Sequence, residues 1–203
     1  MKENVEKVIK ALSKNNIKAR YFEDAESAMN VLLDEINVEE SVGIGGSMTI
    51  SQLGIPEKLK KRGNKVYFHW LESTPEDVDK ARLLASRADV YLTSTNALTE
   101  KGQLVNIDGI GNRVTSMVYG PKKVFVLCGM NKITKDLDDA LEHIKSNTYR
   151  NARRLKLNTP CAITGKCNDC DSPQRMCNVT VIIEKKPDKV EIEVMIINKE
   201  LGY

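Results

Sequence analysis

Aromatic side chains and net charge are both scarce in this 203-residue chain. Aromatic residues make up 5% of it, with three Phe, six Tyr and one Trp, so few side chains are available to stack on unpaired bases. The 31 basic and 28 acidic residues leave a net charge of +3, which is too small to attract a nucleic-acid backbone by itself. The composition therefore predicts no nucleic-acid partner.

Long apolar runs are also missing. No stretch approaches the ~18 consecutive apolar residues of a membrane-spanning helix, and the charged first residues are unlike a secretory signal. With 41% hydrophobic and 29% charged residues, the chain has the composition of a globular domain with a buried core. We therefore expect a protein of the reducing cytoplasm that does not bind or span a membrane.

Helical and extended patterns alternate along most of the chain. Apolar residues recur at helical spacing over residues 5–12, 25–36, 48–53, 56–62, 74–88 and 136–155. Short apolar runs typical of strands lie at residues 18–22, 41–44, 66–68, 90–92 and 123–127. This alternation predicts an α/β fold with a mostly parallel sheet flanked by helices.

The end of the chain shows a different pattern. Residues 179–183 and 190–197 are both of extended type, and a charged turn separates them. Because Glu191 and Glu193 alternate with apolar residues, we expect an antiparallel β-hairpin with one face in water. The predicted division is an α/β domain over residues 1–157, a cysteine-rich metal-binding loop over residues 158–178, and a terminal hairpin over residues 179–203 packed on the same domain.

A glycine-rich segment stands where the strand at 41–44 meets a helix. In open parallel sheets ligands bind at the carboxyl ends of strands. The backbone N–H groups of Gly45, Gly46 and Ser47 are therefore suited to cradle an anion. A plain glycine turn with Ser47 as helix N-cap explains the same residues. The segment is not a P-loop, because it lacks the Gly-Lys-Ser/Thr of that motif.

A polar, glycine-punctuated run of 21 residues, 93–113, follows the strand at 90–92. So long a loop in a compact domain is usually functional. The candidate catalytic carboxylates are Glu100 and Asp108, and the candidate contacts for a substrate carboxylate or phosphate are Asn96, Asn112, Arg113 and Lys132. Turn formation by the carboxylates and structural ion pairs of the two cations are the alternatives.

Cysteine is the most unevenly distributed residue. Four of the five cysteines fall within 17 residues, at Cys161, Cys167, Cys170 and Cys177. In a reducing compartment this clustering favours a metal site over disulfides. Four thiolates on a short loop suit a 4Fe-4S cluster, which we expect, or a tetrahedral zinc ion, which is the alternative.

Part of the polar run resembles a known superfamily. Asn96-Ala97, residues 102–106 and Gly109 are similar to a strand and turn of the superfamily of ribose-5-phosphate isomerase, glucosamine-6-phosphate deaminase and the CoA transferases. Where the sugar-phosphate isomerase branch has its catalytic aspartate, this chain has Asn96. An amide is not a general base, which argues against isomerisation by that mechanism.

A broader resemblance covers nearly the whole chain. The segments that carry it are residues 45–49, 94–97, 112–114, 119–124, 129–133 and 150–152. They are similar to segments of the LUD (lactate utilisation) domain family, formerly DUF162. The resemblance implies the isomerase and CoA-transferase-like fold, and a family linked to lactate oxidation in company with iron-sulfur proteins.

Three hypotheses of function follow. The first is a LUD-family iron-sulfur protein that binds a small carboxylate or phosphorylated metabolite between residues 45–47 and 96–113, as an oxidoreductase component in lactate utilisation or related redox metabolism. The second is a non-catalytic subunit that assembles with electron-transfer proteins. The third is a transferase or isomerase with structural zinc. An oligomer is compatible with all three.

Overall fold

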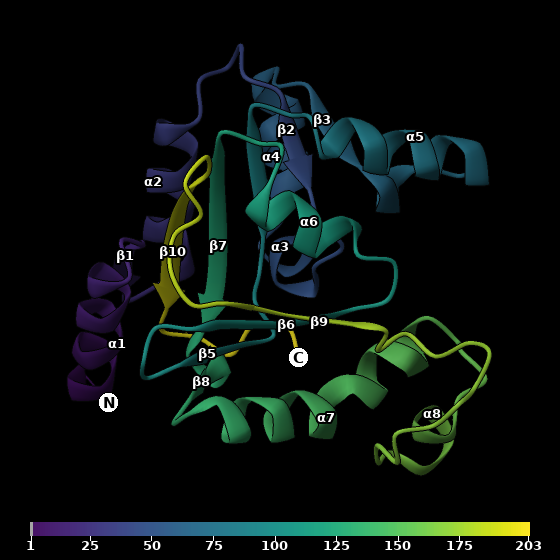
Figure 1. Cartoon of the computed structure of the whole chain (residues 1–203). Helices are drawn as coiled ribbons and strands as arrows, with labels where there is room; N and C mark the ends of the chain where they lie inside the picture. The colour runs from purple at the N-terminus through teal and green to yellow at the C-terminus, as the bar shows by residue number, and fades with distance from the viewer. Residues whose placement is uncertain (1) are drawn as a thin grey trace.

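A six-stranded sheet forms the centre of the protein (Figure 1). The computed structural model describes residues 2–203, and the side chains from residue 4 onward. Every strand of this sheet runs parallel to its neighbours. In spatial order the strands are β1 (Lys18–Phe22), β10 (Glu191–Ile197), β7 (Lys123–Gly129), β4 (Val90–Thr93), β2 (Val42–Ile44) and β3 (Val66–Phe68). The predicted α/β fold with a mostly parallel sheet is confirmed.

Several helices begin where the sequence supplies a capping side chain. Asp24, Thr74 and Asp136 each accept a hydrogen bond from the backbone N–H three residues on, at 2.7, 3.1 and 3.1 Å. The α-helices are α1 (Lys2–Lys14), α2 (Ala25–Glu35), α3 (Met48–Gln52), α4 (Ile55–Arg62), α5 (Pro75–Ala85), α6 (Asn112–Val118), α7 (Leu137–Arg154) and α8 (Pro160–Thr164), and the 3-10 helices are η1 (His69–Leu71) and η2 (Met130–Lys132). No helix in the described part of the chain is long and apolar enough to cross a membrane.

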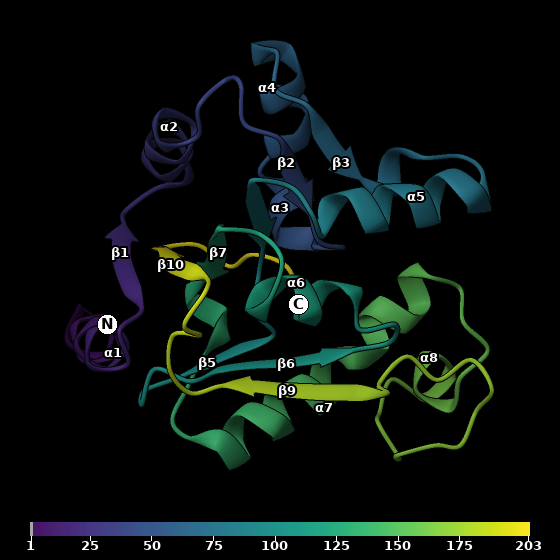
Figure 2. The same ribbon diagram turned by 45° about the horizontal axis from the view of Figure 1, so that its top comes forward.

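A second, smaller sheet was not predicted from the sequence patterns. Its order is β8 (Ile133–Thr134), β5 (Ala97–Thr99), β6 (Leu104–Asp108) and β9 (Val179–Ile183), and only the pairing of β8 with β5 is parallel (Figure 2). Residues 93–113 are therefore not one long loop, because they contain β5, β6 and the start of α6. Leu104 and Val105 are fully buried, which ties this segment to the fold.

The predicted terminal hairpin is wrong. Strand β9 pairs antiparallel with β6, whereas β10 crosses to the large sheet and lies parallel between β1 and β7. Glu193, which suggested a face in water, is 5% exposed and forms an ion pair with Arg20 of β1. The later residues of β10 are all buried, so it is a strand covered on both faces, as parallel strands usually are.

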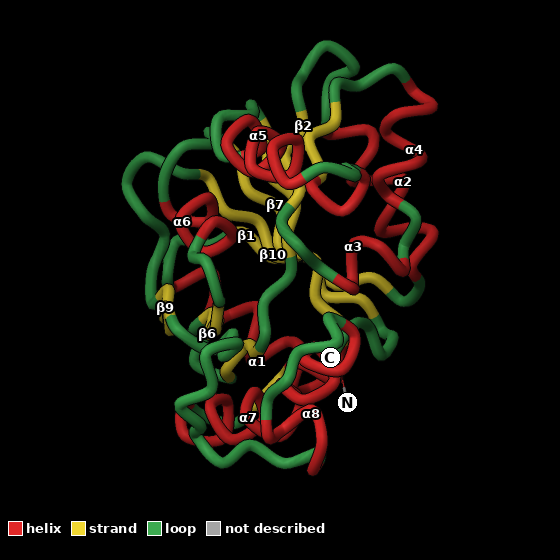
Figure 3. Tube along the Cα trace, turned by 90° about the vertical axis from the view of Figure 1, so that its right-hand side faces the viewer, coloured by secondary structure: helices red, strands yellow, loops and turns green. Residues whose placement is uncertain are grey.

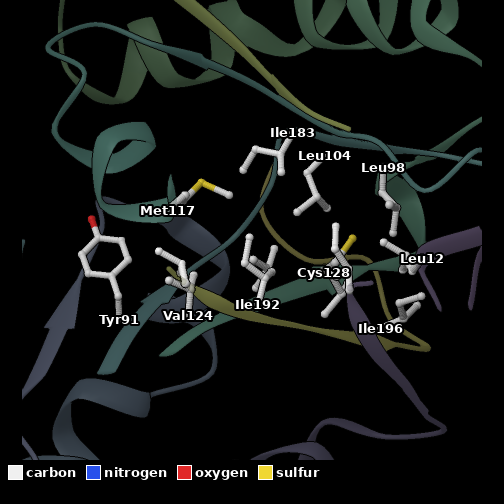
Figure 4. Close-up of a cluster of buried hydrophobic side chains, with 14 of the residues drawn as sticks. Leu12, Tyr91, Leu98, Leu104, Met117, Val124, Cys128, Ile183, Ile192 and Ile196 are labelled. Atoms are coloured by element: carbon white, nitrogen blue, oxygen red, sulfur yellow. The ribbon is translucent and has the colours of Figure 1, made fainter. Parts of the chain in front are cut away.

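Apolar layers cover both faces of the large sheet. One face packs against α2, α3 and α4, with Leu32 and Phe125 among the fully buried side chains. The other packs against α1, α6 and the small sheet, and Figure 4 shows Cys128 on that side with Leu104 and Ile183 of the small sheet opposite. A third layer joins the small sheet to α7, through Ala97, Val105, Ala140 and Ile144. Figure 3 shows helices α7 and α8 at one end of the molecule and α5 at the other.

Candidate functional site

The carboxyl ends of four strands of the large sheet surround a pocket of about 140 Å³. The lining residues at these ends are Gly46 and Ser47 after β2, Trp70 after β3, Ser94, Thr95 and Asn96 after β4, and Lys132 after β7. This is the edge of the sheet at which the sequence patterns predicted ligand binding. Side chains of α7, residues 176 and 177 of the cysteine loop, and residues 202 and 203 complete the wall.

Lys132 supplies a buried positive charge in this pocket. It is 3% exposed, and its Nζ donates a hydrogen bond to the main-chain oxygen of Tyr203. No Asp or Glu carboxylate of the described residues lies within ion-pair distance of it. Burial lowers the pKa of Lys132 to about 8, while Cys128 raises this pKa and Arg113 lowers it. The amine is therefore mainly protonated at pH 7, and a buried ammonium that faces a polar pocket favours an anionic ligand.

Arg113 joins the segments that carry the pocket residues. Its two terminal nitrogens donate to Ser94 O (3.2 Å), Asn106 Oδ1 (2.7 Å), Asn96 Oδ1 (3.0 Å) and Ile107 O (3.0 Å). Its Nε lies 3.6 Å from Oδ2 of Asp108. A guanidinium has five N–H groups, and these contacts engage all three of its nitrogens. We therefore assign Arg113 a positioning role, since few of its donors are left to hold a ligand.

Asn96 belongs to the same network. Its Oδ1 accepts hydrogen bonds from Arg113 and from the Ile107 N–H, both at 3.0 Å. Its own N–H donates to Oδ1 of Asn106 at 3.3 Å. Asn96 thus holds the segment between β4 and β5 against β6. The similar isomerases have an aspartate at this position, whereas the amide of Asn96 supplies no general base.

Asp108 is the carboxylate that lines the pocket. Its Oδ1 accepts a hydrogen bond from the Gly109 N–H at 2.8 Å, and its Oδ2 accepts one from the Val114 N–H at 3.3 Å. The side chain is 12% exposed. These contacts fix the carboxylate at the wall, within reach of a bound molecule.

Two of the candidates within residues 93–113 lie outside the pocket. Glu100 follows β5 and forms an ion pair with Lys7 of α1. Asn112 is the first residue of α6, where its main-chain oxygen accepts a hydrogen bond from Ser116 Oγ at 2.8 Å. The structure therefore brings only one of the two predicted carboxylates, Asp108, together with Lys132.

The glycine segment is shaped by close packing. A Cβ atom added to Gly45 would lie 2.9 Å from Tyr91 Oη, and one added to Gly46 would lie 3.2 Å from Trp70 Nε1. The Gly45 N–H donates to Leu92 O at 3.0 Å, so it is not free for an anion. Ser47 is the N-cap of α3, and its Oγ accepts from the backbone N–H three residues on at 3.3 Å. Gly46 and Ser47 line the pocket, and Gly45 does not.

Sequence patterns missed the contribution of α7. Asn147, Thr148 and Asn151 line the pocket from this helix. They follow Ile144 at spacings of three, four and seven, so they continue the helical stripe that packs on the small sheet. Polar residues in such an otherwise apolar stripe are the signal that would have found them.

The aromatic wall of the pocket adds no charge of its own. Trp70 lines the pocket, and the guanidinium of Arg154 lies 4.3 Å from its ring centroid. Burial lowers the pKa of the neighbouring His69 to about 4, and Arg82 and Arg154 act in the same direction. The His69 ring is therefore neutral at pH 7.

The four clustered cysteines lie on the loop that contains α8. None forms a disulfide; Cys161 is buried and the other three are half-buried. Burial raises the pKa of Cys177, Arg175 lowers it, and the other three loop cysteines raise it. Among residues 4–203, no three His, Cys, Asp or Glu side chains converge as a ready-made metal site. Four free thiols on one loop are nevertheless the donor set that iron-sulfur clusters and structural zinc use.

A second hollow, of about 670 Å³, lies near the opposite ends of the strands. Its half-buried and buried charged residues pair with one another, because Arg20 forms ion pairs with Glu35 and Glu193, and Lys123 lies 2.7 Å from Glu35. The remaining charged residue, Lys18, is exposed, so this hollow has no buried cation like Lys132. The pocket at the carboxyl edge is therefore the candidate site.

These features define an α/β protein of the open parallel-sheet class with a polar, cationic pocket at its carboxyl edge. The chain belongs to the LUD domain family, whose profile matches residues 5–197. This range takes in the cysteine loop and the last two strands, β9 and β10. Its fold is similar to the crystal structure of a DUF162 family protein from Deinococcus radiodurans, with a TM-score of 0.55 and 10% identity over 96% of each chain. No curated protein matches the chain. The resemblance to the LUD family is confirmed.

Proposed function

We propose that this protein binds a small carboxylate, or a phosphorylated acid, in the pocket and takes part in the oxidation of a hydroxy acid such as lactate. The observation that carries the proposal is Lys132, a buried ammonium in the pocket wall. A carboxylate or phosphate in the pocket pairs with this ammonium. In the ligand-free protein the ammonium donates to an oxygen of Tyr203, the last residue of the sequence, and we propose that the bound acid replaces this contact.

The lining of the pocket supports a polar ligand. Besides Lys132 and Asp108, the wall carries the side chains of Ser47, Thr95 and Asn147. Hydroxyl and amide groups of this kind form hydrogen bonds with the oxygens of a carboxylate, hydroxyl or phosphate group.

The pocket residues have separable roles in this proposal. Lys132 binds the carboxylate, and Asn151, whose Oδ1 is occupied by Arg154 at 2.8 Å, keeps its amide N–H groups for the ligand. Oxidation of a 2-hydroxy acid to a 2-oxo acid breaks the O–H and C2–H bonds and removes two electrons and two protons. We assign the acceptance of the hydroxyl proton to Asp108, the carboxylate in the wall. The C2 hydrogen leaves with both electrons, as a hydride, to a two-electron hydride acceptor carried by a partner protein.

The cysteine loop supports the onward transfer of these electrons, one at a time. We propose that Cys161, Cys167, Cys170 and Cys177 hold a 4Fe-4S cluster, with zinc as the alternative. Such a cluster supplies one-electron transfer to electron-transfer protein partners. Cys177 lines the pocket, so the loop reaches the place where the acid binds. Free thiols persist in a reducing compartment, which supports a cytoplasmic location.

A second candidate function is that of a non-catalytic subunit. The four free thiols of the cysteine loop suit this candidate as well, because a cluster or zinc ion held by them would stabilise the loop for assembly with a partner. An assembly subunit loses its partner when the cysteines are replaced and is indifferent to Asp108→Asn. A transferase or isomerase with structural zinc finds less support, because Asn96 supplies no base.

Calorimetric titration of L-lactate, glycolate and inorganic phosphate into the purified protein tests the proposal. We expect saturable binding of at least one of these anions, weakened about tenfold or more by Lys132→Gln, which is ~1.4 kcal/mol. The exposed neighbour variant Lys135→Gln is the matched control and leaves the affinity unchanged. Absence of binding, or equal affinities in both variants, contradicts the proposal.

A further inference from the structure

The last cysteine of the metal loop is also part of the pocket wall. Met176 and Cys177 line the pocket beside Asp108 and Gly109. Their place is set by the pairing of β9 with β6, in which Val179 stands opposite Asp108. Cys177 is two residues from that pair, so the small sheet delivers one loop thiol to the site that holds Asp108.

Hydrogen bonds hold this part of the loop against the pocket. The Asn178 N–H donates to Asp108 O at 3.0 Å, and Asn178 Nδ2 donates to Gly109 O at 3.2 Å. A Cβ atom added to Gly109 would lie 3.2 Å from Met176 O, so the segments around Gly109 and Met176 are in close contact. Movement of Cys177 relative to the pocket therefore requires breaking these contacts.

Arg175 connects Cys177 with the rest of the loop. Its Nε donates to Cys177 O at 3.1 Å, and its Nη1 donates to Cys170 O at 2.7 Å. Its Nη2 lies 2.8 Å from the Asp169 carboxylate. Arg175 thereby links the main chain at Cys177 to the main chain at Cys170, within the segment that carries the other thiols.

We infer that the pocket and the cysteine loop are one thermodynamically coupled unit, with Cys177 as the residue they share. This inference rests on the proposed binding of a small acid at Lys132. A bound acid packs against Cys177 and shields its thiol. Coupling is reciprocal: a metal ion held by the loop changes the affinity for the acid by the same factor as the acid changes the affinity for the metal, typically about five-fold to 150-fold.

Thiol alkylation of the metal-free, reduced protein tests the shielding. Each cysteine is followed by mass spectrometry after a pulse of iodoacetamide, with and without saturating L-lactate. We expect lactate to slow alkylation of Cys177 about fivefold or more. Cys167, which is half-buried, does not line the pocket and is not bonded to Arg175, is the internal control whose rate stays the same. Equal rates at Cys177, or equal slowing at Cys177 and Cys167, overturns the inference.

Two variants separate this inference from the proposed function. Protection of Cys177 disappears in Lys132→Gln and persists in Lys135→Gln. If calorimetry shows lactate binding and Cys177 is not protected, the coupling fails while the proposed function stands. If none of lactate, glycolate and phosphate binds, the proposed function fails, and the coupling with it.

Zinc binding gives the reciprocal measurement. Zn²⁺ alone is titrated into the metal-free protein with and without L-lactate, using a competing chromophoric chelator as the readout. We expect the two zinc affinities to differ about fivefold or more, in the direction and by the factor that zinc changes the lactate affinity. A zinc affinity that saturating lactate leaves unchanged overturns the inference.

Discussion

The guanidinium of Arg113 and the carboxamide of Asn106 form a hydrogen bond of 2.7 Å in the interior of the protein. Asn106 is fully buried and Arg113 is 9% exposed. The bond belongs to a network that also holds Asn96, so it fixes the ends of β4 and β6 where they meet the pocket. The shape of the pocket therefore depends on a cation that is mostly engaged by the protein.

Replacement of Arg113 tests this network. We expect Arg113→Met to lower the free energy of unfolding by about 3–5 kcal/mol, because it leaves buried polar groups unpaired. Arg113→Lys also destabilises, since an ammonium cannot reproduce the planar set of donors. Urea unfolding measures both, with the exposed Arg87→Met as control, expected within about 0.5 kcal/mol of wild type. A loss below about 1 kcal/mol for Arg113→Met is incompatible with the network described.

Anion affinity depends on the protonation of Lys132. Its pKa in the folded protein is about 8, so the ammonium that attracts the anion is present below that pH and lost above it. We expect the association constant for lactate to be constant at pH 6 to 7 and to fall as the pH rises through about 8. Calorimetry over this range checks the effect. A constant affinity up to pH 9.5 means that Lys132 does not bind the anion.

The same residue reduces the stability of the ligand-free protein. The pKa of Lys132 is about 8 when folded and 10.5 when unfolded, so between these values the unfolded chain retains a proton that the folded one has lost. Stability from this group therefore rises with pH across that window. We expect Lys132→Met to stabilise the ligand-free protein at pH 7 by on the order of 2–3 kcal/mol while abolishing anion binding. Thermal unfolding at pH 7 measures this, and a destabilised variant contradicts it.

The two predicted catalytic carboxylates separate in this structure. Asp108→Asn removes the proton acceptor from the pocket, so we expect turnover of the hydroxy acid to fall by about 10²-fold or more while metal content is retained. Glu100→Gln removes an ion pair with Lys7 outside the pocket and costs at most ~1 kcal/mol of stability. Its turnover equals that of wild type. Equal losses in both variants would show that Asp108 has no special role.

The large sheet could be predicted because its strands are short, apolar and separated by helices. The place of strand β10 was predicted wrongly, because Glu193 has the pattern of a solvent-facing residue. Its ion-pair partner Arg20 lies 173 positions away in the sequence. The small sheet was missed since β5 and β6 are short and carry polar residues at Asn106 and Asp108. Their polarity reflects the buried network, which local patterns do not reveal.

The pocket could be predicted only in part. Lys132 and Ser47 follow from their places at strand ends, and Asp108 follows from its place in the polar run 93–113. The proximity of Cys177 to Asp108 depends on the pairing of β9 with β6 across 71 positions, and no local signal announces it. The saturation of Arg113 likewise depends on acceptors from several segments.

The central claim is that an iron-sulfur loop forms one wall of an acid pocket. Iron, acid-labile sulfide and zinc analysis of anaerobically purified protein, together with its visible spectrum, tests this claim most directly. We expect about four irons per chain with broad visible absorption, both lost in Cys167→Ala and retained in Lys135→Gln. One zinc per chain and no colour contradicts the redox function and leaves the cysteine loop a structural element.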